Sequence, residues 1–196
     1  MVDFPISEAG FSLREPFFCY KNIKCLVVSI TFPNFRPRIK TFGFGRQRMK
    51  EEQYKLLVSQ IEALIDGEKD TIAIMSNVAA AIHQTMGFWW TGFYRVVADE
   101  LVLGPFQGPV ACMHIPYGKG VCGTAWQRGE TVIVPDVEQF PGHIACSSES
   151  KSEIVVPVYG SDGKVMAVLD IDSEHLATFD DTDRKYLENI CKLIKE

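Results

Sequence analysis

EIVVPVYGSDGKVMAVLDID, residues 153–172, carries the clearest structural signal in the chain. It contains two short runs rich in Val, Ile and Leu, joined by the turn sequence SDGK at 161–164. Short β-branched runs bounded by Gly, Pro and Asp are typical of strands, and a Gly-containing turn between two of them predicts a hairpin. Four upstream segments have the same character: 88–97, 100–105, 110–116 and 131–136. Together with the two strands of the hairpin, they bring the predicted strands to six.

Helical patterns stand before, among and after these strands. Four segments favour helices: 54–65, 70–87, 118–129 and 179–196. In the first and the last, apolar residues recur at spacings of three and four. Asp70 is a suitable N-cap for the second, and Gly87 is a suitable C-terminal stop. This arrangement predicts an α+β fold, in which a six-stranded antiparallel sheet carries helices packed mainly on one face.

Length and composition favour a single folded domain. A chain of 196 residues with 46% hydrophobic content can bury one good core. The apolar run CLVVSITF at 25–32 is far shorter than the roughly 20 residues that span a bilayer, and no signal-peptide cleavage pattern follows it. We therefore expect a cytoplasmic protein without a membrane partner. In that reducing compartment, the six cysteines favour thiol chemistry over a disulfide framework.

Charge is distributed unevenly along the chain. Residues 1–48 contain eight Lys/Arg and three Asp/Glu, whereas the whole chain has a net charge of −5. The same segment holds eight of the thirteen Phe and four prolines that interrupt any regular pattern. We expect residues 1–48 to be a poorly ordered extension, with a basic targeting arm as the alternative. The acidic domain at 49–196 argues against nucleic-acid binding, and Met49 is a possible true start.

The cysteines differ in their predicted surroundings. Two lie in the extension, and one lies in the last helix, where a small buried hydrophobe is the default explanation. Of the other three, Cys112 falls in the third predicted strand and Cys122 in the Gly-rich short helix. Cys146 lies in GHIACSSESKSEI, residues 142–154, which begins as an irregular loop. Long irregular loops in compact domains are commonly functional, so Cys146 is a candidate for chemistry.

Four motifs in fixed order carry a resemblance to a known family. They are VACMHIPYGKGVCGTAW at 110–126, VPDVEQFPGHIAC at 134–146, SEIVVPVY at 152–159 and VLDIDS at 168–173. Together they resemble the free methionine-(R)-sulfoxide reductases, a branch of the GAF-domain family, over about residues 50–196. GAF domains generally lack this set of three cysteines, a GHIAC loop and a paired-Asp strand. The resemblance implies a GAF-like catalytic domain over residues 49–196.

The resemblance also implies a thiol mechanism. Cys146 would be the nucleophile that takes oxygen from free methionine-R-sulfoxide, leaving a sulfenic acid and methionine. A loop position suits a thiolate that must approach a sulfur atom. Cys122 is then the preferred second thiol for an intramolecular disulfide, with Cys112 as the alternative. Thioredoxin would restore the thiols, no cofactor is required, and the protein could act as a homodimer.

Acidic and aromatic residues complete the expected site. Glu153, Asp170 and Asp172 would hold the substrate ammonium, and a neutral carboxylic acid among them would donate to the sulfoxide oxygen. The alternative is that Asp170 and Asp172 share the solvated face of an edge strand. Trp90 and Tyr94 lie on the same side of the first strand, and the resemblance makes them the wall for the S-methyl group. An aromatic pair at that spacing is ordinarily part of a core.

Two other classes of function stand beside the reductase. One is a non-catalytic GAF small-molecule sensor module, because a fold does not fix a function. The other is a zinc-stabilised interaction module, because His114 and His143 lie close in sequence to Cys112 and Cys146. None of the cysteine pairs has the two to four intervening residues of common structural zinc sites, so we expect no metal site. The reductase is preferred because it uses the cysteines and the acids together.

Overall fold

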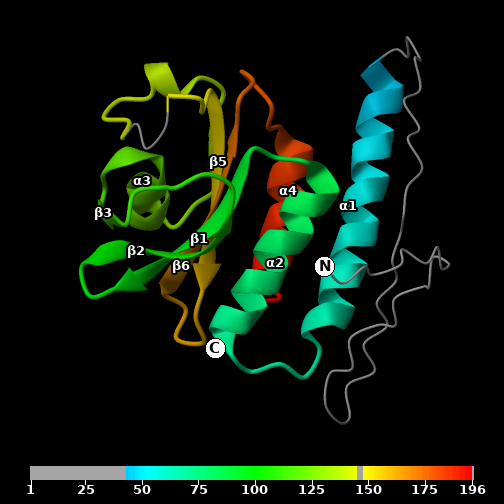
Figure 1. Ribbon diagram of the computed structural model, residues 1–196, viewed down its shortest axis with the longest axis horizontal. Coiled ribbons are helices and arrows are strands. Elements are labelled where there is room, and N and C mark those ends of the chain that lie inside the picture. The colour runs from blue at the N-terminus through cyan, green and yellow to red at the C-terminus, as the bar shows by residue number, and fades with distance from the viewer. Residues whose placement is uncertain (1–42, 145–147, 196) are drawn as a thin grey trace, which may run out of the picture. The chain divides into compact units, whose positions relative to one another are not determined.

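The structure is a computed structural model that describes residues 43–144 and 148–195 (Figure 1). The chain divides into two compact units, Met1–Ile39 and Lys40–Glu196, and every described residue belongs to the second. The expectation of a poorly ordered extension falls largely outside the described residues and stays a prediction. Within the described ranges, no helix combines the length and the apolar character needed to cross a bilayer.

A six-stranded sheet organises the second unit. Its strands lie in the order β3-β2-β1-β6-β5-β4, and each neighbouring pair is antiparallel. The strands β1 and β6 therefore lie side by side at its centre, although they are far apart in sequence. This confirms the predicted fold class. The bounds are β1 Trp90–Val97, β2 Glu100–Gln107, β3 His114–Pro116, β4 Val132–Val134, β5 Ser152–Tyr159 and β6 Val165–Ser173.

The third strand is shorter than the predicted segment 110–116. After β2, Gly108 adopts a φ of 127°, which favours glycine, and Pro109 has no N–H to donate. The chain therefore leaves the sheet, and β3 begins only at His114. Cys112 lies in the connecting segment, so its predicted place in a strand is wrong. Cys112 lies outside the hydrogen-bonded ladder and packs, partly buried, against the hydrophobic cluster that includes Trp90 and Tyr94.

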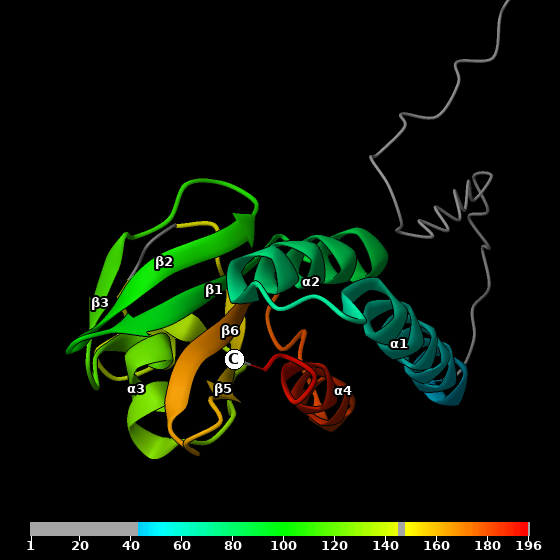
Figure 2. The same ribbon diagram turned by 90° about the horizontal axis from the view of Figure 1, so that it is seen from below.

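The helices gather mainly on one face of the sheet, as predicted (Figure 2). The helix α2 packs on β1 and β2, α4 packs on β5, and α1 packs against both helices. The short helix α3 lies on the opposite face, against β5 and β6. The bounds are α1 Gly43–Ile65, α2 Thr71–Met86, α3 Gly120–Arg128 and α4 Asp181–Cys191, with a short 3-10 helix at Val137–Gln139.

Local sequence sets several of these helix ends. The side chain of Asp70 accepts from the backbone N–H of Ala73 at 2.8 Å, and Gly87 ends α2 with a φ of 71°. Both caps confirm the prediction. The helix α1 begins at Gly43, before the boundary expected at Met49, and α4 ends at Cys191, before the expected end at 196. The folded unit thus includes several residues that were assigned to the extension.

A buried polar network joins α1 to α4. The carboxylate of Asp183 is fully buried and accepts from Tyr54 Oη at 2.7 Å and from Lys50 Nζ. Lys50 also donates to Asp180 at 3.0 Å, and the rings of Tyr54 and Tyr186 stack with centroids 5.3 Å apart. Because a buried carboxylate needs compensating donors, this network fixes α1 on α4.

The alternation of side chains along the strands separates two cores. Toward α1, α2 and α4, the strands bury mainly apolar and aromatic residues such as Phe93, Ile154 and Leu169. Toward α3, Val155 and Val168 pack in a second cluster, together with aromatic side chains of β1. Successive strand residues point to opposite faces of the sheet. Glu153 of β5 and Asp170 and Asp172 of β6 alternate with residues of the first core, so their side chains face α3. This second face holds the candidate site.

Candidate active site

A cavity opens between the sheet, α3 and the loops that precede β3 and β5. It has an empty volume of about 570 Å³, including the open space at its mouth. It brings Trp90, Tyr94, Glu153, Asp170 and Asp172 together, five residues singled out in the sequence. The lining residues are Trp89, Trp90, Tyr94, Val110, Ala111, Ile115, Gly120, Val121, Cys122, His143, Ile144, Ser150, Glu153, Asp170 and Asp172.

Strand register places the three carboxyl groups on one face. In the pairing of β5 with β6, Glu153 lies opposite Asp172, and Val155 lies opposite Asp170. Residues two apart in a strand share a face, so all three side chains point toward α3. The strand β6 lies between β1 and β5, which excludes the alternative that Asp170 and Asp172 lie on a solvated edge strand. Glu153 and Asp170 are each only 6% exposed.

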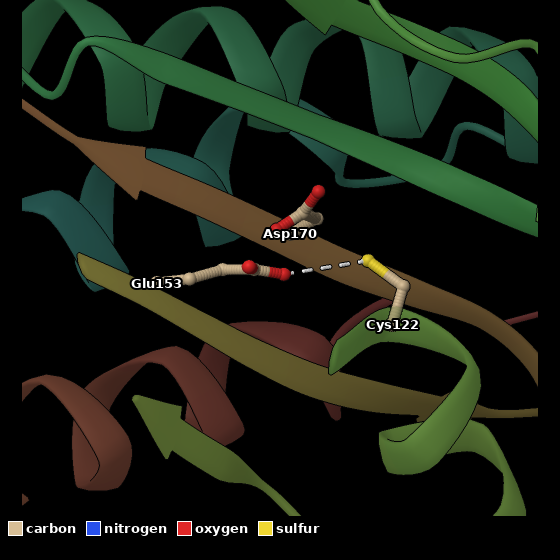
Figure 3. Close-up of side chains that lie close together, drawn as sticks. All are labelled: Cys122, Glu153 and Asp170. Carbon is tan, nitrogen blue, oxygen red and sulfur yellow. Dashed lines mark hydrogen bonds between the residues drawn. The ribbon is translucent and has the colours of Figure 1, made fainter. Parts of the chain in front are cut away.

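Cys122 joins two of these carboxyl groups from the opposite side (Figure 3). Its thiol donates to Glu153 Oε1 with a sulfur–oxygen distance of 3.8 Å. One ligand atom each from Cys122, Glu153 and Asp170 lies within 4.8 Å of the other two. The three side chains come from α3, β5 and β6 and converge on one point. Within the described part of the chain, this is the group of acidic and thiol side chains that could hold a metal ion.

Burial raises the pKa of every acid in this cluster. Desolvation, followed by the charge of Asp170, raises the pKa of Glu153 well above its usual range, and desolvation followed by Asp172 does the same for Asp170. Burial also raises the pKa of the Cys122 thiol well above its ordinary value. Fewer negative charges are therefore present in the cavity than its residue types suggest, and Cys122 is a neutral thiol near pH 7.

Asp172 differs from the other two acids because it has a hydroxyl partner. Burial raises its pKa to about 6, and a hydrogen bond from Ser150 Oγ acts in the opposite direction. Ser150 is itself buried, in the loop before β5. Nothing in the sequence singles out Ser150, because a serine in a Ser-rich loop carries no pattern of its own. Its hydrogen bond to Asp172 forms only because the loop before β5 brings Ser150 next to the end of β6.

The aromatic pair forms one wall of the cavity. The rings of Trp90 and Tyr94 stack with centroids 6.0 Å apart, and Trp90 also stacks on Phe106 at 5.5 Å. Trp90 Nε1 donates to the carbonyl oxygen of Pro109, and Tyr94 Oη donates to that of Cys112, both at 3.0 Å. These bonds hold the wall against the segment that precedes β3. The pair therefore belongs both to the second core and to the cavity.

The described cysteines are in different states. Cys112 is disulfide-bonded. Cys122 and Cys191 are free and buried, so neither is the partner of Cys112. Cys146 lies outside the described residues, and so do Cys19 and Cys25. The structure therefore leaves the predicted role of Cys146 as a prediction.

The histidines named for the zinc alternative lie in different settings. His143 lines the cavity, and partial burial lowers its pKa, which favours its neutral form. It is therefore a poor cation for stabilising a thiolate. His114 is exposed and lies 3.0 Å from Glu100 through its Nδ1. Across the residues that the structure describes, neither histidine joins a group of metal-ligating side chains.

Comparison with known proteins defines the class. Residues 68–195 match the GAF domain, and the chain belongs to the GAF domain family. It is 58% identical to the GAF domain-containing protein A of Dictyostelium discoideum over 146 residues, which cover 74% of this chain and 92% of that protein. The sheet and the helices are thus those of a known small domain.

Within that class, the resemblance to the free methionine-R-sulfoxide reductases is confirmed. The chain is 46% identical to the free methionine-R-sulfoxide reductase of Saccharomyces cerevisiae, over 75% of this chain and 86% of that protein. It also resembles the X-ray structure of free methionine-R-sulfoxide reductase from Neisseria meningitidis in complex with its substrate. That likeness has a TM-score of 0.72 and 52% identity, and covers 74% of this chain and 87% of the other.

Proposed function

We propose that this protein reduces free L-methionine (R)-S-oxide to L-methionine. The observation that carries the proposal is the convergence of three carboxyl groups and an aromatic wall in one cavity. The carboxyl groups suit the polar groups of a free amino acid, and the aromatic wall suits a methyl group on sulfur. The yeast and Neisseria proteins named above for this activity support the same reading.

Substrate recognition follows from the two sides of the cavity. Carboxylates among Glu153, Asp170 and Asp172 accept charge-assisted hydrogen bonds from the substrate ammonium. The rings of Trp90 and Tyr94 contact the S-methyl group. A carboxyl group that carries its proton donates it toward the sulfoxide oxygen, which makes the sulfur more electrophilic. The substrate sulfur is then open to attack from the loop side of the cavity.

Oxygen transfer uses the thiolate of Cys146. Its sulfur attacks, the bond between sulfur and oxygen in the substrate breaks, and the oxygen is transferred to Cys146 together with a proton from the carboxyl group. The products are a sulfenic acid on Cys146 and methionine. The substrate sulfur gains the two electrons that the Cys146 sulfur loses. No cofactor enters this balance.

A second thiol then removes the sulfenic acid, as the first step in regenerating the enzyme. It attacks the sulfenic sulfur, water leaves and a disulfide forms. We assign this step to Cys112 because Cys112 is already disulfide-bonded, while Cys122 is free. Cys122 is only 4% exposed, and the raised pKa of its thiol leaves little reactive thiolate. A dithiol protein of the thioredoxin type then reduces the disulfide by exchange.

The test is incubation of the full-length protein with racemic free methionine sulfoxide and dithiothreitol, followed by chiral analysis. We expect loss of the free R epimer and little loss of the S epimer, because only one epimer presents its oxygen to the acids while its methyl group contacts Trp90. An acetylated and amidated methionine sulfoxide should react very poorly, since it has no ammonium and each unmatched buried polar group costs about 1 to 3 kcal/mol.

Cys146→Ser is the matched variant, and it should abolish turnover because a hydroxyl is a much poorer nucleophile toward sulfur. No loss of either epimer would favour a non-catalytic sensor, which would still bind the free amino acid. Equal rates on the free and the blocked compounds would refute the enclosed-site reading even in an active enzyme.

A further inference from the structure

We propose that Cys122, Glu153 and Asp170 form a binding site for a zinc-type divalent cation inside the cavity, and that bound metal excludes the amino-acid substrate. The metal site itself does not depend on the proposed function. Only the competition with substrate rests on it.

The ligand atoms of the three side chains are spaced somewhat more widely than those of a tetrahedral zinc site. With bonds of about 2.3 Å to sulfur and about 2.0 Å to oxygen, ligand atoms around zinc lie about 3.3 to 3.5 Å apart. Cys122 Sγ lies 3.8 Å from Glu153 Oε1, and the atoms of the triad, including one from Asp170, lie within 4.8 Å of one another. Small side-chain rotations bring all three to a common ion, because they already point toward one another (Figure 3).

The cluster also lacks a cation and a full set of hydrogen bonds. Among the described residues that line the cavity there is no Lys or Arg. Asp170 is only 6% exposed, and its Oδ1 has no hydrogen-bond partner within the described ranges. A buried carboxyl oxygen without a hydrogen-bond partner is costly, and a bound cation would satisfy it. This orphaned oxygen is an observation independent of the clustering.

The ligand set selects the kind of metal. A cysteine sulfur favours zinc and other soft or borderline cations, whereas magnesium and calcium prefer sites made only of oxygen. Binding replaces the thiol proton of Cys122, and the protons carried by Glu153 and Asp170, with the metal; these protons are released to solvent, without any change of oxidation state. Three protein ligands leave a fourth position open toward the cavity, where a water or a small anion can bind.

Occupancy has a direct consequence for the cavity. Glu153 and Asp170 cannot bind both a divalent ion and the substrate ammonium. A zinc-type ion would therefore act as a reversible competitor of free methionine sulfoxide, and the redox state of Cys112 need not change.

Cobalt is the probe for the site, because a cobalt–thiolate bond gives near-ultraviolet charge-transfer absorption. Co²⁺ is titrated into the full-length protein in the state in which Cys112 is disulfide-bonded, so that its thiol is not available. We expect a charge-transfer band that Zn²⁺ removes and that Mg²⁺ leaves unchanged. The band should be lost in Cys122→Ser and kept in Cys191→Ala, the matched control at the other buried free cysteine.

A second pair of variants protects the test against a folding failure in Cys122→Ser. Glu153→Gln and Asp170→Asn should each lower the affinity for Zn²⁺ by at least about tenfold, with circular dichroism as the check on folding. Absence of the band in the wild type, an equal band in Cys122→Ser, or unchanged zinc affinity in both carboxyl variants would overturn the proposal.

Free methionine sulfoxide added to the cobalt-loaded protein should weaken the band. A protein that shows the Cys122-dependent band but never consumes methionine sulfoxide would refute the proposed function and leave the metal site standing. An active reductase without the band would refute the metal site alone.

Discussion

The chemical reactivity of a residue at the cavity depends on the groups that it contacts. Cys122 and Cys112 are both cysteines near one cavity, yet Cys122 is a buried free thiol that donates to Glu153, and Cys112 is disulfide-bonded. A thiol surrounded by carboxyl groups is kept protonated, so it is a poor nucleophile. The carbonyl oxygen of Cys112, in contrast, accepts from Tyr94, which belongs to the aromatic wall of the cavity. The two thiols should therefore respond differently to substitution.

Cys112→Ser should lower the thioredoxin-coupled rate by at least about tenfold, because the sulfenic acid on Cys146 loses its resolving thiol. A small external thiol should restore part of that rate by reaching the sulfenic acid directly. Cys122→Ala should retain the coupled rate far better. Steady-state assays with thioredoxin and with dithiothreitol measure both effects. A larger loss in Cys122→Ala, rescued by dithiothreitol, would instead make Cys122 the resolving thiol.

Gly92 is required by the close approach of the aromatic wall. A Cβ at this position would lie 2.5 Å from Cβ of Phe106 and 2.5 Å from Cη2 of Trp90. We expect Gly92→Ala to lower the free energy of unfolding by about 1 to 3 kcal/mol, as overpacked cores do. It should also raise the KM for free methionine sulfoxide, because Trp90 must move. Urea unfolding and initial rates test this, and unchanged values in both would show that the wall adapts without strain.

The position of α1 depends on polar contacts as well as on apolar packing. It packs on α2 and α4 rather than on the sheet, and its first half is joined to α4 through Lys50 and the buried Asp183. Apolar contacts from Tyr54 and Leu57 add to this joint. Because Asp183 has no exposure, its hydrogen bonds contribute more than those of a surface pair.

Lys50→Ala should lower the free energy of unfolding by about 1.5 to 3 kcal/mol, because it removes a charged donor from the buried carboxylate of Asp183. Lys55→Ala is the matched control on the same helix. Lys55 is half-exposed and pairs with Glu51 and Glu52, so its loss should cost no more than about 0.5 kcal/mol. Chemical denaturation measures the free energy of unfolding of both variants. Equal losses would show that the buried network stabilises the protein no more than a surface ion pair does.

For the chain as a whole, the boundary between the two units gives a prediction about truncation. Deleting residues 1–39 should leave activity and thermal stability nearly unchanged, since it removes one compact unit and none of the candidate site residues. Deleting residues 1–48 should lower the melting temperature. That deletion removes the first turns of α1 and the hydrogen bond from Gln47 to Thr182. A large loss after the shorter deletion would show that residues 1–39 stabilise the domain.

Local patterns in the sequence were enough to predict the elements. Apolar periodicity, turn residues and the caps at Asp70 and Gly87 act over a few neighbours, so six strands and their flanking helices could be read without tertiary contacts. The three acids and the aromatic pair were assigned to a site through the family resemblance, because their spacing alone favoured a solvated strand face for the aspartates and a core for the aromatic pair. The predicted strand at 110–116 wrongly included Cys112, because Gly108 and Pro109 lead the chain out of the sheet after β2 and the next strand begins only at His114.

Long-range pairing settled what local patterns left open. Asp170 and Asp172 could lie on a solvated edge or in a buried site, and the choice depends on whether β6 has a partner on each side. It has β1 on one side and β5 on the other, from segments about 75 and about 15 residues away in sequence. The contacts of Ser150 with Asp172 and of Cys122 with Glu153 likewise join different elements. Burial and strand register depend on how distant segments pair in the assembled sheet, so they cannot be predicted from a few neighbouring residues.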